Sequence, residues 1–291
     1  IKNNNIDIVH CHGFKAGAVG RLGAFFAKCP SIYTIHNFVP EKQSGKLRLV
    51  SKIEQILFPV TKNIIVVSRA LKKHLVHDIK LSPNKISVIY NGVEPIKASD
   101  NSIRKKHGIR EDTIVVVTVA RLIPSKGIDF LLDAIPIVVS NYPNTKFIII
   151  GDGPDKEKLQ NKADAMKEKN HIIMTGYVDD IKKYYNAMDI FVLPTLSEGL
   201  GISVLEAMSA GKAVIATNVG GIPEIIRHRW NGYLIAPENK LEIANAIMHL
   251  IRNNSVRNIL GDNAFDYVVE NFNIDDMIQQ TAFLIANSID N

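Results

Sequence analysis

Short runs of apolar, mostly β-branched residues alternate with longer amphipathic stretches along almost the whole chain. The apolar runs predict strands at Ile6–His10, Ser31–Ile35, Asn63–Val67, Ile86–Tyr90, Ile114–Ala120, Lys146–Ile150, His171–Met174, Ile190–Leu193, Ala213–Thr217 and Gly232–Ile235. Strands that are apolar throughout and separated by helices are typical of parallel sheets covered on both faces. The pattern therefore predicts an α/β protein.

The alternation is interrupted between Asn91 and Asp112, where "NGVEPIKASDNSIRKKHGIRED" is rich in turn formers and charges. We place the main boundary there. Residues 1–95 form a partial N-terminal domain, because they hold only about four strands, and residues 96–272 form a doubly wound Rossmann-like domain. The last stretch, residues 273–291, is predicted to be a helix that docks through one face. The predicted docking residues of this helix are Ile274, Met277, Ile278, Phe283 and Leu284.

Composition narrows the class of protein. Of the 291 residues, 46% are hydrophobic and 22% charged, with a net charge of +6, which suits anionic partners, but no basic motif interleaved with aromatic residues indicates nucleic acid. Cys11 and Cys29 are the two cysteines and have no CxxC spacing, so a reducing, cytoplasmic location is expected. No apolar run approaches the roughly 18 to 20 residues of a membrane span. The chain opens without Met or a signal segment, and we expect it to lack an N-terminal part.

Two cations follow the strand predicted at Ile114–Ala120. Arg121 and Lys126 lie in the loop after its carboxyl end, and Gly127 precedes a predicted helix. Ligands bind at the carboxyl ends of strands in open α/β sheets, and this pair suits a diphosphate because Arg offers a planar fork and Lys a point charge. The alternative is that both are solvated loop charges.

The segment "TLSEGLGISVLEAMSAG", residues 195–211, carries Glu198 in a glycine-rich loop and Glu206 in the helix that follows. The N–H groups around Leu200 to Ser203 are expected to point out of the helix N-terminus, which attracts phosphate. Glu206, about one turn further along, is suited to accept hydrogen bonds from both hydroxyls of a ribose. The alternative is an ordinary surface helix with a solvated glutamate.

Three other motifs favour structural roles. "GDGPDKEKL" at Gly151 has two glycines without a third and is more typical of a turn than of a phosphate loop. "NVGGIPEII" places Pro223 at a helix start and Glu224 in its first turn. "KLRLVSKIEQILF", residues 46–58, is basic and amphipathic, which favours a surface helix over contact with acidic lipid.

The histidines in "DIVHCHGF" lie on one side of a predicted strand end. A metal bound by His10 and His12 would need further ligands, and His36 in "YTIHNF" is a candidate third, but no spacing brings it to the other two. The pattern favours a polar histidine at a crevice. The chain also lacks Asp-x-Asp, the pair that commonly holds a divalent metal on a nucleotide diphosphate. Arg, Lys and backbone dipoles are therefore expected to stabilise the negative charge of a diphosphate.

Several segments together resemble the signature of glycosyltransferase family 4. They are "VARLIPSKGIDFLLDAI", "GDGP", "GYVDDIKKYYNAMDIFVLPTLSEGLGISVLEAMSAGKAVIATNVGGIPEII" and "NGYLI". The resemblance runs from about Asp7 to the C-terminus and is most specific between Val119 and Glu224. It implies the GT-B fold, in which two Rossmann-like parallel-sheet domains face each other across a cleft, and a retaining, metal-independent transferase without a cofactor.

The resemblance assigns the two glutamates of the glycine-rich segment. The family's Glu-x7-Glu motif falls on Glu198 and Glu206. It implies that Glu206 holds the donor ribose, and that Glu198, with the backbone of Gly199, Leu200 and Gly201, faces the donor sugar and its phosphate.

The resemblance also extends to the phosphates and the base. Arg121 and Lys126 match the family's diphosphate pair. Gly176, Tyr177 and Val178 match the segment that recognises the base through its main chain.

In the first domain, His12 matches the histidine that projects toward the donor sugar, and the last helix is implied to cross back to this domain. Family members begin with strands and a glycine-rich loop that help to form the acceptor side, and none of these precedes Ile1. The first domain is therefore expected to be incomplete, and the activity of this chain depends on what is missing.

The predicted function is transfer of a hexosyl group from a nucleotide-diphosphate sugar to a hydroxyl of a lipid-linked or cell-surface glycan acceptor. The enzyme is expected in the cytoplasm, with peripheral contact at the inner membrane face as an option. Two alternatives stay open: a nucleotide-sugar 2-epimerase of the same fold, which needs no acceptor, and an inactive nucleotide-binding fragment. The sequence does not distinguish uracil, guanine and adenine, because main-chain recognition leaves little side-chain trace.

Overall fold

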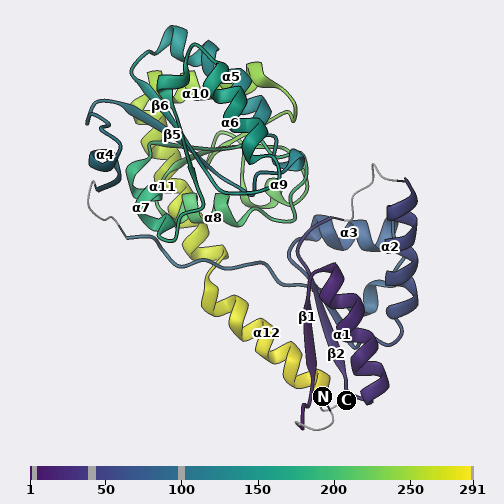
Figure 1. The fold of residues 1–291 in the computed structure, drawn as a ribbon. Coiled ribbons are helices and arrows are strands. Elements are labelled where there is room, and N and C mark those ends of the chain that lie inside the picture. Colours follow the sequence, from purple (N-terminus) through teal and green to yellow (C-terminus); the bar gives the residue numbers. More distant parts are fainter. Residues whose placement is uncertain (2–4, 39–43, 98–101, 290–291) are drawn as a thin grey trace. The chain divides into compact units, whose positions relative to one another are not determined.

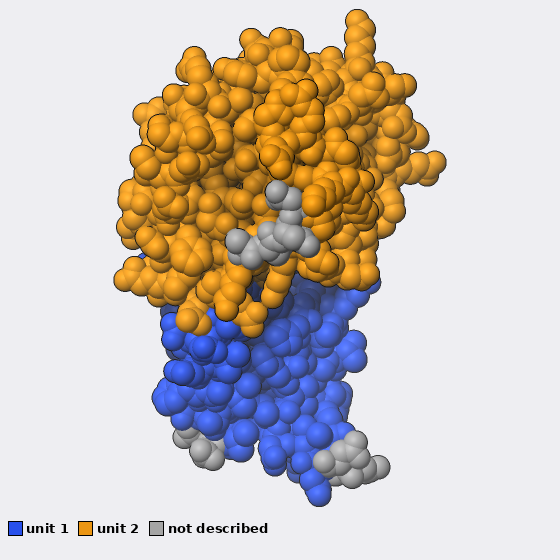
Figure 2. All heavy atoms as spheres, turned by 90° about the vertical axis from the view of Figure 1, so that its left-hand side faces the viewer, with its two compact units in different colours: residues 1–92, 198–200, 274–291 blue, residues 93–197, 201–273 orange. Residues whose placement is uncertain are grey.

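The computed structural model describes residues 1, 5–38, 44–97 and 102–289, except for the side chains of residues 44–48. The chain divides into two compact units (Figures 1 and 2). The first comprises Ile1–Gly92, Glu198–Leu200 and Ile274–Asn291, and the second comprises Val93–Ser197 and Gly201–Asn273. Residues 98–101 of the predicted boundary segment lie outside the described residues.

The first unit holds a four-stranded parallel sheet in the order β1-β2-β3-β4. Its strands are β1 (Val9–His12), β2 (Ser31–Ile35), β3 (Asn63–Val66) and β4 (Ile86–Val88). Its helices are α1 (Phe14–Ala27), α2 (Ser44–Leu57), α3 (Arg69–His77) and α12 (Ile274–Ile289), with a 3-10 turn at Pro83–Lys85. The strand predicted at 6–10 was placed too early, because β2 begins at Ser31 and pairing with it starts at Val9.

Helices α1 and α12 cover opposite faces of this sheet. Ile32 and Ile65 form a small core against residues of α12, whereas Tyr33, which points the other way along β2, lies against Gly17 of α1. The last helix of the chain therefore belongs to the first unit, as Figure 1 also shows.

The predicted docking face of α12 was only partly right. Met277, Leu284 and Ile285 pack on the core, but Ile278 and Phe283 are 53% and 72% exposed. At 3.6 residues per turn Phe283 lies about 120° around the helix from Met277, outside the stripe that meets the sheet.

The second unit holds a six-stranded parallel sheet in the order β10-β9-β8-β5-β6-β7. Its strands are β5 (Ile114–Val119), β6 (Thr145–Ile150), β7 (Ile172–Gly176), β8 (Ile190–Leu193), β9 (Ala213–Thr217) and β10 (Tyr233–Ile235). Its helices are α4 (Ser102–Lys106), α5 (Ile128–Asn141), α6 (Lys156–Ala165), α7 (Ile181–Ala187), α8 (Ile202–Ser209), α9 (Ile222–Ile225), α10 (Lys240–Arg252) and α11 (Asn254–Asn271), with 3-10 turns at Pro124–Lys126 and Lys169–His171.

Both faces of this sheet are buried. On one face Val116 and Ile215 pack with Leu131 of α5 and Ile247 of α10, and on the other face α8 and α11 contact β9. Burial on both faces explains why the strands are apolar throughout. The predicted fold class, α/β with two parallel sheets, is confirmed, and β2, β8 and β9 have the predicted bounds.

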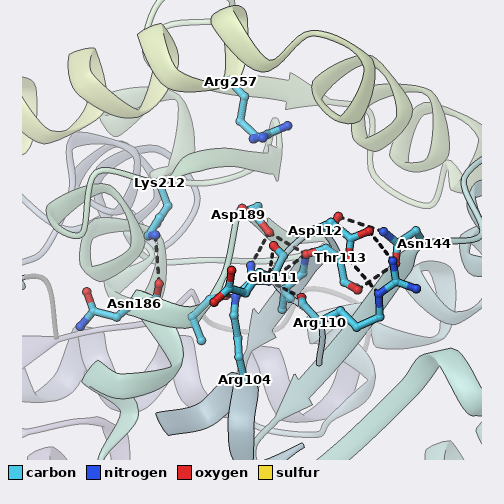
Figure 3. A network of polar contacts seen from close by, with 12 residues as sticks. Arg104, Arg110, Glu111, Asp112, Thr113, Asn144, Asn186, Asp189, Lys212 and Arg257 are labelled. Atoms are coloured by element: carbon cyan, nitrogen blue, oxygen red, sulfur yellow. Dashed lines mark hydrogen bonds and ion pairs between the residues drawn. The ribbon is translucent and has the colours of Figure 1, made fainter. Parts of the chain in front are cut away.

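A polar network fixes α4 to the amino ends of the second sheet (Figure 3). The Arg104 guanidinium donates to the carboxylate of Asp189 at 2.8 Å and to the carbonyls of Ala187 and Thr113 at 3.0 and 2.9 Å. The same oxygen of Asp189 accepts from the N–H of Val115 at 2.8 Å. Because these groups surround the start of β5 and β8, the network stabilises the end of the sheet opposite to the carboxyl ends.

Among the described residues, no helix has the length and apolar character that crossing a membrane requires.

Candidate functional site

The strand order of the second unit contains a switch point between β5 and β8. Strands β6 and β7 follow β5 on one side, and the chain then returns to place β8, β9 and β10 on the other. Ligands of open α/β sheets bind outside the carboxyl ends of the strands at such a point. Arg121 and Lys126 follow β5, and the segment that begins at Pro194 follows β8, so both loops lie at this position.

Backbone contacts hold these two loops together. The N–H of Leu196 and the hydroxyl of Thr195 both donate to the carbonyl of Ser125, at 2.7 and 3.0 Å. Gly127 has φ 65°, and a Cβ on it would lie 2.0 Å from the carbonyl oxygen of Pro194. A side chain at position 127 would therefore separate the loops. The loop after β5, which carries the two predicted phosphate-binding cations, is thus fixed to the loop after β8, which leads to the predicted helix start.

Arg121 is exposed, and Lys126 is half-buried at the end of the 3-10 turn Pro124–Lys126. Both positions agree with the predicted place of these cations, directly beyond the carboxyl end of β5. Exposure leaves the Arg121 guanidinium accessible to an anion at the switch point.

The glycines of "GDGP" serve packing. A Cβ on Gly151 would lie 1.9 Å from the carbonyl oxygen of Ala120, and one on Gly153 would lie 2.3 Å from that of Leu122. The N–H of Gly151 donates to the carbonyl of Gly176 at 2.9 Å. This segment is therefore a turn that joins the loops after β5, β6 and β7.

Helix α8 begins at the switch point. Gly201 precedes it with φ 103°, and its carbonyl accepts from the N–H groups of Val204 and Leu205 at 3.0 and 3.1 Å. The N–H groups of the first turn have no acceptor within the helix and carry partial positive charge. The predicted helix start is confirmed. The N-terminus of a helix in general favours an anion.

Glu206 is held by a tyrosine from another helix. The hydroxyl of Tyr185, on α7, donates to the Glu206 carboxylate at 2.7 Å. Burial raises the pKa of Glu206 above its usual value, although the bond from Tyr185 and the nearby Lys182 act in the opposite direction. Burial and the adjacent carboxylate keep the pKa of Tyr185 well above its usual value, so its hydroxyl remains a donor. Glu206 is therefore a fixed acceptor, unlike the solvated glutamate of the alternative interpretation.

The predicted base-binding segment ends β7 and continues into a loop. Gly176 has φ 70°, and Tyr177 is 74% exposed. A cavity of about 630 Å³ lies beside this segment, lined among others by Thr175, Val178 and Lys183.

The first unit brings three histidines together. His12 and His10 come from β1, and His36 follows β2. Nδ1 of His12 lies 3.0 Å from Nε2 of His36, and Nε2 of His10 lies 2.7 Å from the hydroxyl of Thr34. Burial, followed by the neighbouring histidines, lowers the pKa of His10 and of His36. The sequence did not connect His36 to the other two, and the pairing of β1 with β2 does so.

No group of three or more His, Cys, Asp or Glu side chains in the described part of the chain is arranged to hold a metal.

Three residues of the glycine-rich loop, Glu198–Leu200, group with the first unit. Glu198 is half-buried, and Gly199 and Leu200 are buried. A Cβ on Gly199 would lie 1.9 Å from the carbonyl oxygen of His36, so only glycine allows this approach.

Sequence reasoning missed Tyr185 and the bond between His12 and His36. "KKYYNAMD" offers two adjacent tyrosines of which one could face the site, but no spacing links Tyr185 to Glu206, which lies 21 positions away.

Two family models match the chain. The model of glycosyl transferases group 1 matches residues 99–267, and the model of Glycosyltransferase Family 4 matches residues 1–97.

The relatives that match across most of the chain include two glycosyltransferases from different organisms. It is 31% identical over 285 residues to the UDP-Gal:alpha-D-GlcNAc-diphosphoundecaprenol alpha-1,3-galactosyltransferase of Escherichia coli, a match that covers 94% of this chain and 73% of that protein. It is 28% identical over 288 residues to an uncharacterized glycosyltransferase of Methanocaldococcus jannaschii, covering 94% of this chain and 74% of that protein.

Among solved structures, Anabaena HepE in complex with UDP-glucose matches with a TM-score of 0.89 and 26% identity. The match covers 97% of this chain and 79% of HepE.

Proposed function

The chain belongs to glycosyltransferase family 4, and from this premise we propose that it is a retaining, metal-independent hexosyltransferase. It transfers a hexosyl group from a nucleotide-diphosphate sugar to a hydroxyl of a lipid-linked or cell-surface glycan. The nucleotide of the donor is proposed to be UDP, because the E. coli relative uses UDP-Gal and HepE binds UDP-glucose.

The observation that carries the proposal is the arrangement at the switch point of the second unit. The loop with Arg121 and Lys126 is bonded through Ser125 to the segment that leads into α8. Two features that attract phosphate therefore lie at the same end of the sheet: a pair of cations and the N-terminus of a helix. Glu206, one turn into α8, is held as an acceptor by Tyr185, which suits a ribose that follows the diphosphate.

The base is proposed to lie at Gly176, Tyr177 and Val178. These residues follow β7, and the backbone bond from Gly151 to Gly176 joins them to the loop after β6. A nucleotide with its diphosphate beyond β5 and its base beyond β7 would cross the loop after β6. The glycines at positions 151 and 153 of that loop leave little side-chain bulk in the way.

In the proposed reaction the bond between C1 of the sugar and the β-phosphate oxygen breaks, and the acceptor oxygen forms a bond to C1 on the same face. The electron pair of the broken bond passes to the β-phosphate, so negative charge grows there. Arg121, Lys126 and the N–H groups at the start of α8 stabilise this charge more in the transition state than in the bound donor. The acceptor's proton passes to a phosphate oxygen, and no metal is needed. His12 and Glu198 are proposed to contact the donor sugar.

The acceptor is proposed to be lipid-linked, because the E. coli relative acts on a diphosphoundecaprenol-linked sugar. Peripheral contact with an acidic membrane would use α2, where Leu49 and Ile56 are 59% and 71% exposed. The basic Lys46 and Arg48 of that helix have side chains outside the described part. Cosedimentation with anionic but not zwitterionic vesicles is expected.

The donor is tested first by calorimetry and thermal melting with UDP-, GDP- and ADP-hexoses. A UDP-hexose should raise the melting temperature, because it binds only the native state. A rise with GDP- or ADP-hexoses alone would contradict the choice of uracil, and no rise with any donor would contradict the nucleotide site.

Transfer is then assayed with lipid-linked sugar acceptors and excess chelator. An α-linked product from an α-linked donor is expected, detected by NMR of the anomeric proton. Activity that requires Mg²⁺, a β-linked product, or release of an epimerised donor without acceptor would each contradict one part of the proposal.

A further inference from the structure

His12 is hydrogen-bonded to a histidine from the neighbouring strand. Its Nδ1 lies 3.0 Å from Nε2 of His36, and the two rings are stacked, with centroids 5.3 Å apart and 15° between their planes. In such a bond one nitrogen carries the proton and the other presents its lone pair. The bond therefore fixes the orientation of His12 and couples its tautomer to that of His36, because only one of the two facing nitrogens carries the proton.

His10 does not make the same contact. Its ring centroid lies 4.2 Å from that of His12, but its Nε2 pairs with the hydroxyl of Thr34 at 2.7 Å. His10 packs against the ring of His12, whereas His36 is hydrogen-bonded to Nδ1 of His12.

The surroundings keep His36 suited to this bond. Burial lowers its pKa, and the neighbouring His12 lowers it further. A neutral His36 can share one proton with His12, whereas two protonated rings would turn two N–H groups toward each other. His36 also adjoins the Glu198 loop, because its carbonyl oxygen lies 1.9 Å from the position that a Cβ of Gly199 would take.

We propose that His36 is a positioning residue that, through its Nε2, holds the imidazole of His12 in one tautomer and one orientation. Nε2 of His12, the ring nitrogen that this bond does not use, then serves the donor sugar. The role of His12 at the sugar rests on the proposed function, but the effect of His36 on the tautomer of His12 is a property of the chain itself.

Three variants separate positioning from packing. His36→Phe keeps a ring of similar size and removes the nitrogen. His36→Gln keeps a hydrogen-bonding group near the position of Nε2. His77→Phe, at the exposed end of α3 in the same unit, is the matched control for loss of a histidine. If His36→Phe fails to fold, His36→Ala replaces it in every measurement.

The first measurement is ¹⁵N NMR of the imidazole nitrogens in the full chain without substrate. His12 is expected as one tautomer in the unaltered chain, in His36→Gln and in His77→Phe, and as a mixture in His36→Phe. The same tautomer composition of His12 in the unaltered chain and in His36→Phe would overturn the proposal.

The second measurement is the kinetics of sugar transfer. His36→Phe should lower kcat by about fivefold to tenfold, the equivalent of one net hydrogen bond, with the donor KM nearly unchanged and with recovery in His36→Gln. In a His12→Ala background, His36→Phe should have no further effect, and an undiminished effect there would overturn the proposal. Absence of transfer by every variant and by the unaltered chain would contradict the proposed function, while the tautomer measurement still decides the role of His36.

Discussion

Replacing Tyr185 with phenylalanine removes the hydroxyl that donates to the Glu206 carboxylate at 2.7 Å and keeps the buried ring. A hydrogen bond to a charged group contributes about 1.5 to 3 kcal/mol to stability, and the partial exposure of Glu206 favours the lower half of this range. In a unit of this size each 1 kcal/mol shifts the melting temperature by about 2 to 4 °C. We therefore expect the second unit to melt about 3 to 9 °C lower in Tyr185→Phe at neutral pH.

The way in which the stability loss in Tyr185→Phe changes with pH tests whether it comes from the hydrogen bond to Glu206. Burial raises the folded-state pKa of Glu206 above its unfolded value, so the stability that this group contributes is present below the unfolded pKa and is lost as pH rises through the folded pKa. The bond from Tyr185 opposes that rise, and its removal raises the folded pKa further. The loss in Tyr185→Phe should therefore be larger at neutral pH than at about pH 4, where a neutral bond contributes only about 1 kcal/mol.

Differential scanning calorimetry across this pH range, with UDP titrations at neutral pH, measures both effects. Tyr184→Phe is the matched control, because Tyr184 is the buried neighbour on α7 and, among the described residues, its hydroxyl has only a long 3.4 Å contact with His107. UDP affinity should fall in Tyr185→Phe and not in Tyr184→Phe. Equal melting temperatures for the two variants, or a loss in Tyr185→Phe that does not change with pH, would refute the reasoning.

Three further substitutions, two of them paired with a control substitution, test the site and its scaffold. Lys126→Ala should weaken UDP binding by about 1.5 to 3 kcal/mol in calorimetry, the range for a charge-assisted contact, and unchanged affinity would remove this residue from the site. Arg104→Ala should destabilise the second unit by about 3 kcal/mol in chemical denaturation, because its partner carboxylate stays largely buried, whereas Arg110→Ala, whose side chain is 75% exposed, should cost about 0.5 kcal/mol or less; similar losses would contradict this assignment. Gly127→Ala should lower the melting temperature more than Gly108→Ala, because both have positive φ but only Gly127 has a carbonyl oxygen 2.0 Å from the added Cβ, and an equal change would show that the clash relaxes.

Local pattern was enough for the architecture. Strands β2, β8 and β9 have the predicted bounds, because a strand buried on both faces must be apolar throughout and must end where polar or turn residues begin. The start of α8 after Gly201 and its end before Gly211, which has φ 66°, followed from the glycines alone. The position of Arg121 and Lys126 beyond β5 needed only the order of elements along the chain.

Contacts between residues that are far apart in the sequence could not be predicted from the local pattern of apolar and polar residues. Periodicity could not say which stripe of α12 meets the sheet, and it placed Phe283 on the wrong side. The sequence determined that Glu206 lies about one turn into a helix and that His12 lies near the end of a strand, since both are local facts. Only the tertiary structure decided that Tyr185 fixes Glu206 and that His36 fixes His12. These partners are 21 and 24 positions apart, and strand order and helix packing, rather than spacing, bring their atoms within hydrogen-bonding distance.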